Sequence, residues 1–465
     1  MHSAVLTGTG LYQPPFTITN AELVQAFNRY VDLHNARHAD AIARGEQQAL
    51  QHSSVEFIEK ASGIQQRFVL EKSGILDPER MYPHYPQRGD DELSLMAEIA
   101  VAAAQQALAQ AGRTGADVDM VLCAASNMQR AYPAMAVEIQ QALGAGGYGF
   151  DMNVACSSAT FALEQAVNAV RSGSSRCVLV VNPEITSAHQ EWRDRDCHFI
   201  FGDVCTAILI ERADTAVAAE RWEVLGTRLA TQFSNNIRNN FGFMNRCEDA
   251  DPQARDKTFR QEGRKVFKEV VPIAAAHIEG HLAQLALQPD QVRRFWLHQA
   301  NEGMNQLVIK KLVGTATADR APLILDTFAN TASAGSIIAF QNSQLFNKNF
   351  RNMTRNHKFE CVKVEVGISY GTDVERARKI ILETLATLPF LSKVKKTSVV
   401  LDSFGDSAVN LGVWVWVPVM TKSSSLSSVR EHIYNAFNEH GISIPFPQQD
   451  LYVKEFPGGA PVQGT

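Results

Sequence analysis

The chain has 465 residues, of which 45% are hydrophobic and 20% are charged, and its formal net charge is −5 at pH 7. These totals are typical of a globular protein with more than one domain, and the acidic balance predicts no nucleic-acid-binding surface. The most apolar run near the carboxyl end, residues 408–420, is shorter than the ~20 residues that a transmembrane segment needs, so no such segment is predicted.

The chain starts with MHSAVLTGTGLY, which is typical of a strand that runs into a glycine turn. This start lacks the basic residues and the apolar core of a secretory leader. The seven cysteines include no CxxC pair, so we expect reduced thiols and a cytoplasmic protein. The sequence predicts no metal site and no cofactor.

Residues 4–345 alternate between strand patterns and helix patterns. Val118–Ser126 and Arg176–Glu184 are short apolar runs that end in turn residues, whereas Ser94–Gly112 is an alanine-rich helical pattern. This alternation predicts a layered α/β fold. A more polar span, residues 30–91, interrupts the alternation, and we interpret it as an insertion or a cap.

A weak internal repeat runs through this part of the chain. A predicted strand that ends at Cys123 is followed by Cys156 at the start of a run of small residues. In the second half, a predicted strand that ends at His298 is followed at nearly the same interval by Asn330. A further predicted strand leads into Asn330 and the small residues after it. Two copies of one βαβ arrangement would place Cys156 and Asn330 at matching helix starts, with His298 at a neighbouring strand end.

Cys156 lies in NVACSSATFAL, where a buried strand is predicted to lead directly into a helix. The free N–H groups and the dipole of a helix start favour a thiolate, which is the nucleophilic form of cysteine. The same N–H groups can bind an oxyanion on an attacked carbonyl. The alternative is a small buried hydrophobe, which is the usual role of a lone cysteine. We assign that role to Cys123, Cys177, Cys197, Cys205, Cys247 and Cys361.

His298 and Asn330 each have a structural alternative as well. His298 follows the apolar FWL and could be a buried structural histidine, and Asn330 in ANTASAGS could be a helix cap. Because both arrive in the other half at places that match the surroundings of Cys156, the combination favours a Cys-His-Asn site.

With these residues placed, residues 4–340 resemble the β-ketoacyl-acyl-carrier-protein synthases III of the thiolase-like superfamily. The resemblance rests on stretches that occur in family order: DMNVACSSATFAL, FIFGDVCTAILI, EGRKVFKEVV, WLHQAN and NTASAGS. It implies a thiolase-like, duplicated αβαβα core with domains at residues 1–215 and 216–345. The polar insertion is also similar to that of the branch that includes dialkylresorcinol-forming ketosynthases.

The resemblance implies that Cys156 takes an acyl group from a thioester. His298 and Asn330 would then hold the thioester oxygen of a malonyl-type extender and stabilise the enolate left by decarboxylation, which attacks the acyl group in a Claisen condensation. The implied enzyme is an acyltransferase of fatty acid or polyketide biosynthesis. Its implied partners are acyl carrier protein, acyl and malonyl thioesters, and a second copy in a homodimer.

Two departures from the family pattern concern the substrates. The places of the Trp and Arg that clamp the adenine of coenzyme A hold Phe57 and Ala61, so an acyl group on carrier protein is the expected primer. Phe57 and Tyr132, which falls where the family shapes its acyl pocket, are the candidate substrate-pocket residues. Gly303 stands where the family has a basic residue for carrier protein. The positive surface could come instead from Lys265, Lys268, Lys310 and Lys311.

A third departure is the truncated end of the second half. Family members continue past NTASAGS into two strands joined by a glycine-rich turn, whose N–H completes the oxyanion hole, and nothing similar follows Phe340. Because the loss of one such donor typically lowers the rate by a factor of ~10² to 10³, we expect reduced activity. The alternative is a catalytically impaired thiolase-fold chimera whose tail serves oligomerisation.

The tail, residues 346–465, has a different pattern. Helices are expected after a cap at Thr372 or Asp373 and before Gly441, and strands at residues 359–370, 397–402, 408–417 and 450–454. This order predicts a ferredoxin-like α+β domain. Stretches such as VGISYGTDVERARKIILETL resemble the cytoplasmic carboxyl-terminal domain of small-conductance mechanosensitive channels. Their pore helices are absent, so no channel is predicted; an oligomeric channel fragment is a third alternative.

Overall fold

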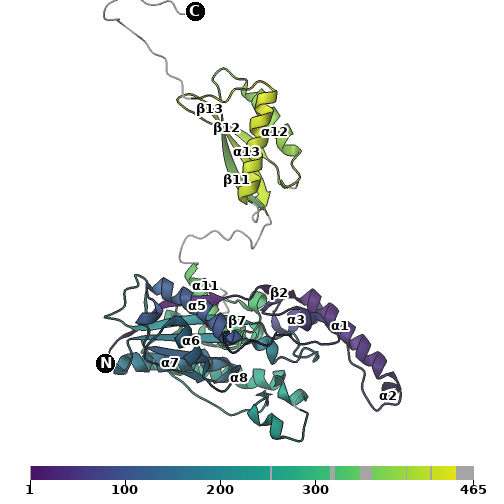
Figure 1. Ribbon diagram of the computed structural model, residues 1–465, viewed down its shortest axis with the longest axis vertical. Coiled ribbons are helices and arrows are strands. Elements are labelled where there is room, and N and C mark those ends of the chain that lie inside the picture. Colours follow the sequence, from purple (N-terminus) through teal and green to yellow (C-terminus); the bar gives the residue numbers. More distant parts are fainter. Residues whose placement is uncertain are drawn as a thin grey trace, which may run out of the picture. The chain divides into compact units, whose positions relative to one another are not determined.

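The structure is a computed structural model that describes residues 2–251, 254–314, 320–345, 359–393, 395–418 and 422–446. The chain divides into two compact units, Met1–Lys348 and Asn349–Thr465, and Figure 1 shows the elements of each. The boundary lies close to the one predicted between residues 345 and 346. Residues 216–345, predicted as a domain of their own, belong to the same compact unit as residues 1–215.

A six-stranded sheet forms the centre of the first unit, in the order β5-β4-β6-β7-β1-β8. β4 pairs in parallel with β5 and β6, while β7 is antiparallel to both β6 and β1. The strands predicted at residues 118–126 and 176–184 are confirmed as β4 and β6. The strands are β1 (Ala4–Tyr12), β4 (Met120–Ala124), β5 (Tyr148–Met152), β6 (Cys177–Glu184), β7 (Val204–Arg212) and β8 (Trp222–Glu223).

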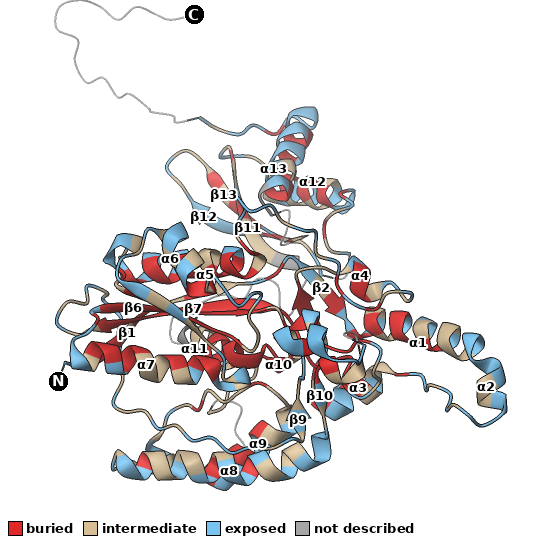
Figure 2. Ribbon diagram, turned by 60° about the horizontal axis from the view of Figure 1, so that its bottom comes forward, coloured by how far each residue is buried: buried red, intermediate tan, exposed pale blue. Residues whose placement is uncertain are grey.

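Helices cover both faces of this sheet. On one face lie α5 (Leu95–Ala111) and α6 (Met135–Leu143), and on the other lies α7 (Ser158–Ser172), as Figure 2 shows. Side chains alternate along β4, so that Cys123 joins the core under α5 and α6 whereas Leu122 joins the core under α7. Because both faces are buried there, the central strands β4, β6 and β7 are mainly apolar.

Close contact between α5 and β1 depends on the glycines of the sequence GTG. A Cβ atom added to Gly8 would lie 2.1 Å from the Ala107 carbonyl oxygen, and one added to Gly10 would lie 1.9 Å from that of Ala103. Only glycine permits this approach of backbone to backbone. The helix predicted at residues 94–112 is confirmed as α5.

The polar span predicted as an insertion or a cap, residues 30–91, includes the second half of the 18-residue helix α1 and several shorter elements. Within it, β3 pairs antiparallel with the preceding β2, and the Phe68 carbonyl of β3 accepts from the Asp203 N–H. In Figure 1, α1 and α2 extend away from the central sheet. Most residues between 81 and 90 line a cavity of the first unit. The elements of this region are β2 (Phe16–Thr19), α1 (Asn20–Arg37), α2 (Ala39–Ala43), α3 (Val55–Ser62), β3 (Gln66–Val69) and α4 (Ser73–Leu76).

The second half of this unit differs from the prediction in its strands. Two strand predictions are wrong. Residues 295–298, predicted as the strand that ends at His298, join no sheet, and the residues before Asn330 form the helix α10 instead of a strand. A strand needs a hydrogen-bonded neighbour, and none of the described strands pairs with residues 295–298. The elements are β9 (Ile237–Arg238), β10 (Arg260–Gln261), α8 (Gly263–Gln284), α9 (Glu302–Val313), α10 (Leu325–Phe328) and α11 (Gly335–Leu345).

The second unit contains a three-stranded antiparallel sheet in the order β11-β13-β12. Asp373 caps α12 by accepting from the Glu375 N–H at 2.9 Å, so the cap predicted at Thr372 or Asp373 is Asp373. The strand predicted at residues 450–454 lies outside the described residues. The described elements follow the predicted order: β11 (Phe359–Ile368), α12 (Val374–Ala386), β12 (Ser398–Phe404), β13 (Val409–Pro418) and α13 (Lys422–Glu439).

Candidate active site

Cys156 lies in a short turn of 3-10 helix, η2 (Ala155–Ser157), between the end of β5 and the start of α7. Ala155 adopts φ = +47°, in the left-handed region that few residues other than glycine occupy. The Ala155 N–H donates to Asn153 Oδ1 at 3.0 Å, and the Ser158 hydroxyl donates to the Ala155 carbonyl at 2.8 Å. Side chains on both sides of Cys156 thus hold this turn in a strained conformation.

The second half repeats this turn in η7 (Ala332–Ala334), directly before α11. Ala332 adopts φ = +46°, and its N–H donates to Asn330 Oδ1 at 2.9 Å. The two turns contact each other. They are therefore equivalent parts of a duplicated fold, and they meet at one place.

This equivalence corrects one detail of the predicted repeat. The helix starts match as expected, but Asn330 is the equivalent of Asn153, which makes the same bond to a left-handed alanine. The equivalent of Cys156 is Ser333. The thiol and the carboxamide therefore come from different positions of the same turn, one position in each copy.

Asn330 is 5% exposed and is fixed by its backbone as well as by its side chain. Its N–H donates to the Ile200 carbonyl at 3.0 Å, and its carbonyl accepts from the Gly202 N–H at 3.1 Å. Because Oδ1 accepts from the Ala332 N–H, the amide nitrogen is the end of the side chain that is oriented to donate to a substrate.

His298 lies in an extended segment beside the start of α11. Its neighbour Gln299 is fully buried and accepts from the Ile324 N–H at 3.1 Å. A Cβ atom added to Gly335, the first residue of α11, would lie 3.0 Å from the Gln299 Cβ, so glycine lets the segment approach the helix. Burial lowers the pKa of His298 to about 4, which leaves the imidazole neutral at pH 7.

The thiol of Cys156 differs from the expected thiolate. Burial and, secondly, the charge of Glu184 raise its pKa to about 12, while the backbone N–H of Cys156 opposes the shift. The effect of burial thus outweighs that of the helix start. The thiol is protonated at pH 7, and it has to lose its proton as it attacks.

We expect the alkylation rate of Cys156 to rise about tenfold per pH unit from pH 7 to pH 10, because the thiolate fraction of a thiol with a pKa of about 12 rises in that proportion. Peptide mass spectrometry after treatment with iodoacetamide measures this rate. The exposed Cys247 serves as an internal control for the reagent. A rate that levels off below pH 9 would instead reveal a thiolate stabilised by the helix start.

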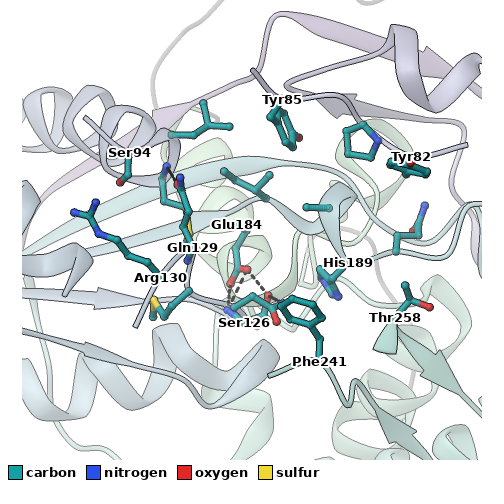
Figure 3. Close-up of a pocket in the computed structure, with 18 of the residues that line it drawn as sticks. Tyr82, Tyr85, Ser94, Ser126, Gln129, Arg130, Glu184, His189, Phe241 and Thr258 are labelled. Carbon is teal, nitrogen blue, oxygen red and sulfur yellow. Dashed lines mark hydrogen bonds between the residues drawn. The ribbon is translucent and has the colours of Figure 1, made fainter. Parts of the chain in front are cut away.

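A buried glutamate that no sequence pattern singled out joins the two halves of the site. Glu184, the last residue of β6, is 1% exposed. Its carboxylate accepts from the Ser126 N–H at 3.0 Å and from the Ser126 hydroxyl at 2.5 Å (Figure 3). It also accepts from the Ser333 N–H at 3.2 Å and from the Ser333 hydroxyl. The available signal was a carboxylate at the end of the apolar strand CVLVVNPE.

A cavity of about 880 Å³ lies beside the carboxylate of Glu184 (Figure 3). The Tyr85 hydroxyl lies 3.0 Å from Ser187 Oγ. This contact connects two walls of the cavity, residues 81–96 and residues 184–193. We call residues 81–96 the strap; residues 81–91 belong to the predicted cap, and the rest leads into α5. The walls are formed by residues 81–96 (the strap), 126–130, 184–193 and parts of 239–258.

The three predicted catalytic residues are not part of the cavity wall. Cys156 and Asn330 are placed by the paired turns, and His298 by the segment beside α11. Glu184 and Ser126 line the cavity and also connect it with the turn of Asn330, through Ser333.

Phe57 and Tyr132, the candidate substrate-pocket residues, lie outside the wall of this cavity. Phe57, on α3, has the guanidinium of Arg195 at 3.9 Å from its ring centroid, and Tyr132 is 85% exposed in the loop before α6. Neither side chain lines the cavity.

Sequence comparisons show which proteins this chain is similar to. The family profile of 3-oxoacyl-[acyl-carrier-protein (ACP)] synthase III matches residues 150–232, and the profile of the carboxyl-terminal part of that family matches residues 282–355. The β-ketodecanoyl-[acyl-carrier-protein] synthase of Pseudomonas aeruginosa is 58% identical over 322 residues, which cover 69% of this chain and 92% of that protein. The chain belongs to the β-ketoacyl-acyl-carrier-protein synthase III family.

A further relative and a solved structure are similar to this chain. The β-ketoacyl-[acyl-carrier-protein] synthase III of Bartonella bacilliformis is 34% identical over 247 residues, which cover 52% of this chain and 73% of that protein. The crystal structure of the synthase III from Aquifex aeolicus has a TM-score of 0.58 at 20% identity, and the match covers 89% of this chain and 99% of that chain. The predicted thiolase-like fold and the predicted class of acyltransferase are confirmed.

The tail of this synthase matches a different family. The profile of the carboxyl-terminal domain of the mechanosensitive ion channel MscS matches residues 362–444, which confirms the predicted resemblance. No helix in the described residues of either unit combines the length and the apolar character that a membrane span requires.

Proposed function

We propose that this synthase loads an acyl group onto Cys156 and condenses it with a malonyl group on acyl carrier protein, which yields a β-ketoacyl product. The observation that carries the proposal is the contact between η2 and η7, which brings the turn of Cys156 against the turn of Asn330. The third residue of the proposed Cys-His-Asn site is His298, whose imidazole is neutral at pH 7. Donors without negative charge suit a reaction whose transition states carry negative charge.

In the first half-reaction, the sulfur of Cys156 attacks the carbonyl of an acyl thioester. A carbon–sulfur bond forms at Cys156, the bond to the donor thiol breaks, and the donor thiol leaves with the proton that Cys156 gives up. The backbone N–H of Cys156, in the turn directly before α7, is the donor available to the oxyanion of this step.

In the second half-reaction, the malonyl thioester loses its carboxylate as carbon dioxide. The electron pair of the broken bond moves onto the thioester, and the enolate oxygen accepts hydrogen bonds from His298 and from the amide nitrogen of Asn330. The enolate carbon attacks the acyl carbonyl, the carbon–sulfur bond to Cys156 breaks, and the released thiolate takes a proton from water. The β-ketoacyl chain leaves on carrier protein.

The proposed acyl chain is octanoyl. The relative that is 58% identical is named for a β-ketodecanoyl product, and a condensation that adds the malonyl-derived unit reaches that length from an octanoyl group. The cavity beside Glu184, at about 880 Å³, lies within the range of ~300 to 1,000 Å³ that ligand pockets occupy. Most of its strap, residues 81–91, comes from the polar span.

The proposed docking surface for carrier protein is a positive face of α8 and α9. Arg264, Lys265 and Lys268 are exposed on α8, and Lys310 and Lys311 are exposed on α9, which packs against α8. Exposed cations of this density steer an acidic partner toward the synthase at low salt. This surface replaces the basic residue that the family has at the position of Gly303.

The proposed compartment is the cytoplasm. All seven cysteines of the chain are free thiols, and a reducing compartment keeps thiols in that state.

The proposed assembly is a homodimer that forms through β5. This strand lies at one edge of the sheet, and an edge strand presents backbone groups that can pair with another chain. Tyr148 is 46% exposed and Phe150 is 38% exposed on the same strand. Two copies related by a twofold axis would pair these edges antiparallel and cover both side chains.

Phe150→Lys should convert the dimer into a monomer in light scattering, because it places like charges opposite each other across the paired edges. Val217→Lys is the matched control, since it adds the same charge at a residue that is 62% exposed in the loop between β7 and β8. The control should stay dimeric. A monomeric wild-type protein, or a dimeric F150K variant, would contradict pairing through β5.

Incubation of the synthase with malonyl-carrier protein and either octanoyl-coenzyme A or octanoyl-carrier protein tests the proposed reaction. We expect an octanoyl mass increment on Cys156, followed by β-ketodecanoyl-carrier protein. The donor that loads faster identifies the primer. Loading without a β-ketoacyl product would overturn the proposed condensation, and no loading from either donor would overturn the whole proposal.

A further inference from the structure

We infer that Glu184 is a positioning residue for the condensation step. It holds the turn that carries Asn330 against the part of the fold that carries Cys156. The inference rests on the proposed function and adds to it a residue outside the Cys-His-Asn set.

The carboxylate of Glu184 is shared between the two halves of the duplicated fold. Its Oε2 accepts from the Ser126 hydroxyl at 2.5 Å, just past the end of β4 in the first half. Its Oε1 accepts from the Ser333 N–H at 3.2 Å and from the Ser333 hydroxyl in the second half. The link to Asn330 is short, because Ser333 follows Ala332, whose N–H fixes Asn330 Oδ1. One side chain therefore sets the position of η7 on the first half of the fold.

The cost of this arrangement argues that Glu184 does more than stabilise the fold. Removal of an ionised carboxylate from water is expensive, and only good hydrogen bonds offset the expense. Burial raises the pKa of Glu184 even though both serines donate to it. An uncharged side chain could fill the same space without that cost, so the charge itself has a use in the site.

The same charge acts on the nucleophile. Glu184 contributes to the raised pKa of the Cys156 thiol. Its loss should therefore have two opposite effects, since the thiolate forms more readily while Asn330 loses its fixed position. A residue with a purely structural role would slow both half-reactions together, and this difference makes the inference testable.

Glu184→Gln and Ser333→Ala separate the two effects. The amide of E184Q has no charge and offers one acceptor oxygen, so we expect alkylation of Cys156 at pH 8 to be faster by about threefold or more. Single-turnover condensation from preloaded octanoyl-Cys156 should be slower by ~10- to 100-fold. S333A keeps the charge and loses the hydroxyl bond, so its alkylation should match the wild type while its condensation falls by about tenfold.

Glu211→Gln is the matched control for the loss of a buried carboxylate. Glu211 is as buried as Glu184, accepts from the Thr7 hydroxyl at 2.5 Å and pairs with Arg113 at 2.7 Å. It lies opposite Cys177, at the far end of β6 from Glu184. The control should lower the melting temperature and leave both rates of the folded protein unchanged.

Condensation by E184Q at the wild-type rate would overturn the inference, as would an equal fall of alkylation and condensation in E184Q. If E184Q does not fold, S333A decides the question, and wild-type condensation by S333A would overturn the inference. A wild-type protein that loads but does not condense would overturn the proposed function instead, and this is recognised before any variant is made.

Discussion

Cys156→Ala should abolish acyl loading and lower product formation by at least ~10⁴-fold. The sulfur of Cys156 holds the acyl group between the half-reactions, and alanine offers no atom that can form that bond. The turn around it should persist, because it is held by Asn153 and Ser158 rather than by the thiol. The variant therefore tests the nucleophile alone.

The measurement is the intact mass of the protein after incubation with octanoyl-coenzyme A or octanoyl-carrier protein. Cys247→Ala is the matched control, since it removes an exposed thiol of the same chain, and it should load and condense like the wild type. An octanoyl increment that survives in C156A would mean that another nucleophile carries the acyl group, and the proposed mechanism would fall.

Asn330→Ala should lower the condensation rate by ~10² to 10³ and leave acyl loading almost unchanged. The amide nitrogen of Asn330 donates to a charge that develops only when the malonyl group loses carbon dioxide. Its Oδ1 is already engaged by the Ala332 N–H, so the carboxamide cannot turn to present its oxygen without breaking that bond. Asn330→Asp should be at least as slow, because a carboxylate repels the enolate.

Rapid mixing of octanoyl-loaded protein with malonyl-carrier protein measures the condensation step separately from loading. Asn20→Ala is the control for the loss of a buried asparagine, because Asn20 is 2% exposed and its side chain bonds Arg67 and the Ile64 carbonyl, in the β2–β3 region. It should reduce stability and leave the ratio of the two rates unchanged. An N330A variant in which loading falls as far as condensation would indicate misfolding of the site rather than loss of a donor.

The first half of the fold and the tail could be predicted because their signals are local. Ser94 caps α5 by accepting from the Ala97 N–H at 3.3 Å, and Gly112 ends it with φ = +67°. Such caps depend only on residues within a few positions of the helix end. The same holds for Asp373 before α12.

The second half could not be predicted from local pattern. Phe295 and its neighbours have the apolar character of a strand, but a strand forms only beside another strand, and here the Phe295 N–H donates to the Arg320 carbonyl at 2.7 Å outside any sheet. The sequence placed Cys156, His298 and Asn330 through the repeat and the family resemblance. It could not reveal Glu184 as a residue of the site, because the proposed role of Glu184 depends on its contact with Ser333, which is far from it in the sequence.

The left-handed alanines also bear on how this protein can diverge. An ancestral duplication with two identical turns would have offered two equivalent positions for a reactive side chain. The present chain has the thiol of Cys156 at one of these positions. At the other it has Ser333, whose N–H donates to the carboxylate of Glu184. We therefore expect few substitutions at either position. The proposed reaction requires the thiol of Cys156, and the buried carboxylate of Glu184 requires the hydrogen bonds from Ser333. Changes in chain-length preference should accordingly accumulate in the strap, which contains neither Cys156 nor Ser333.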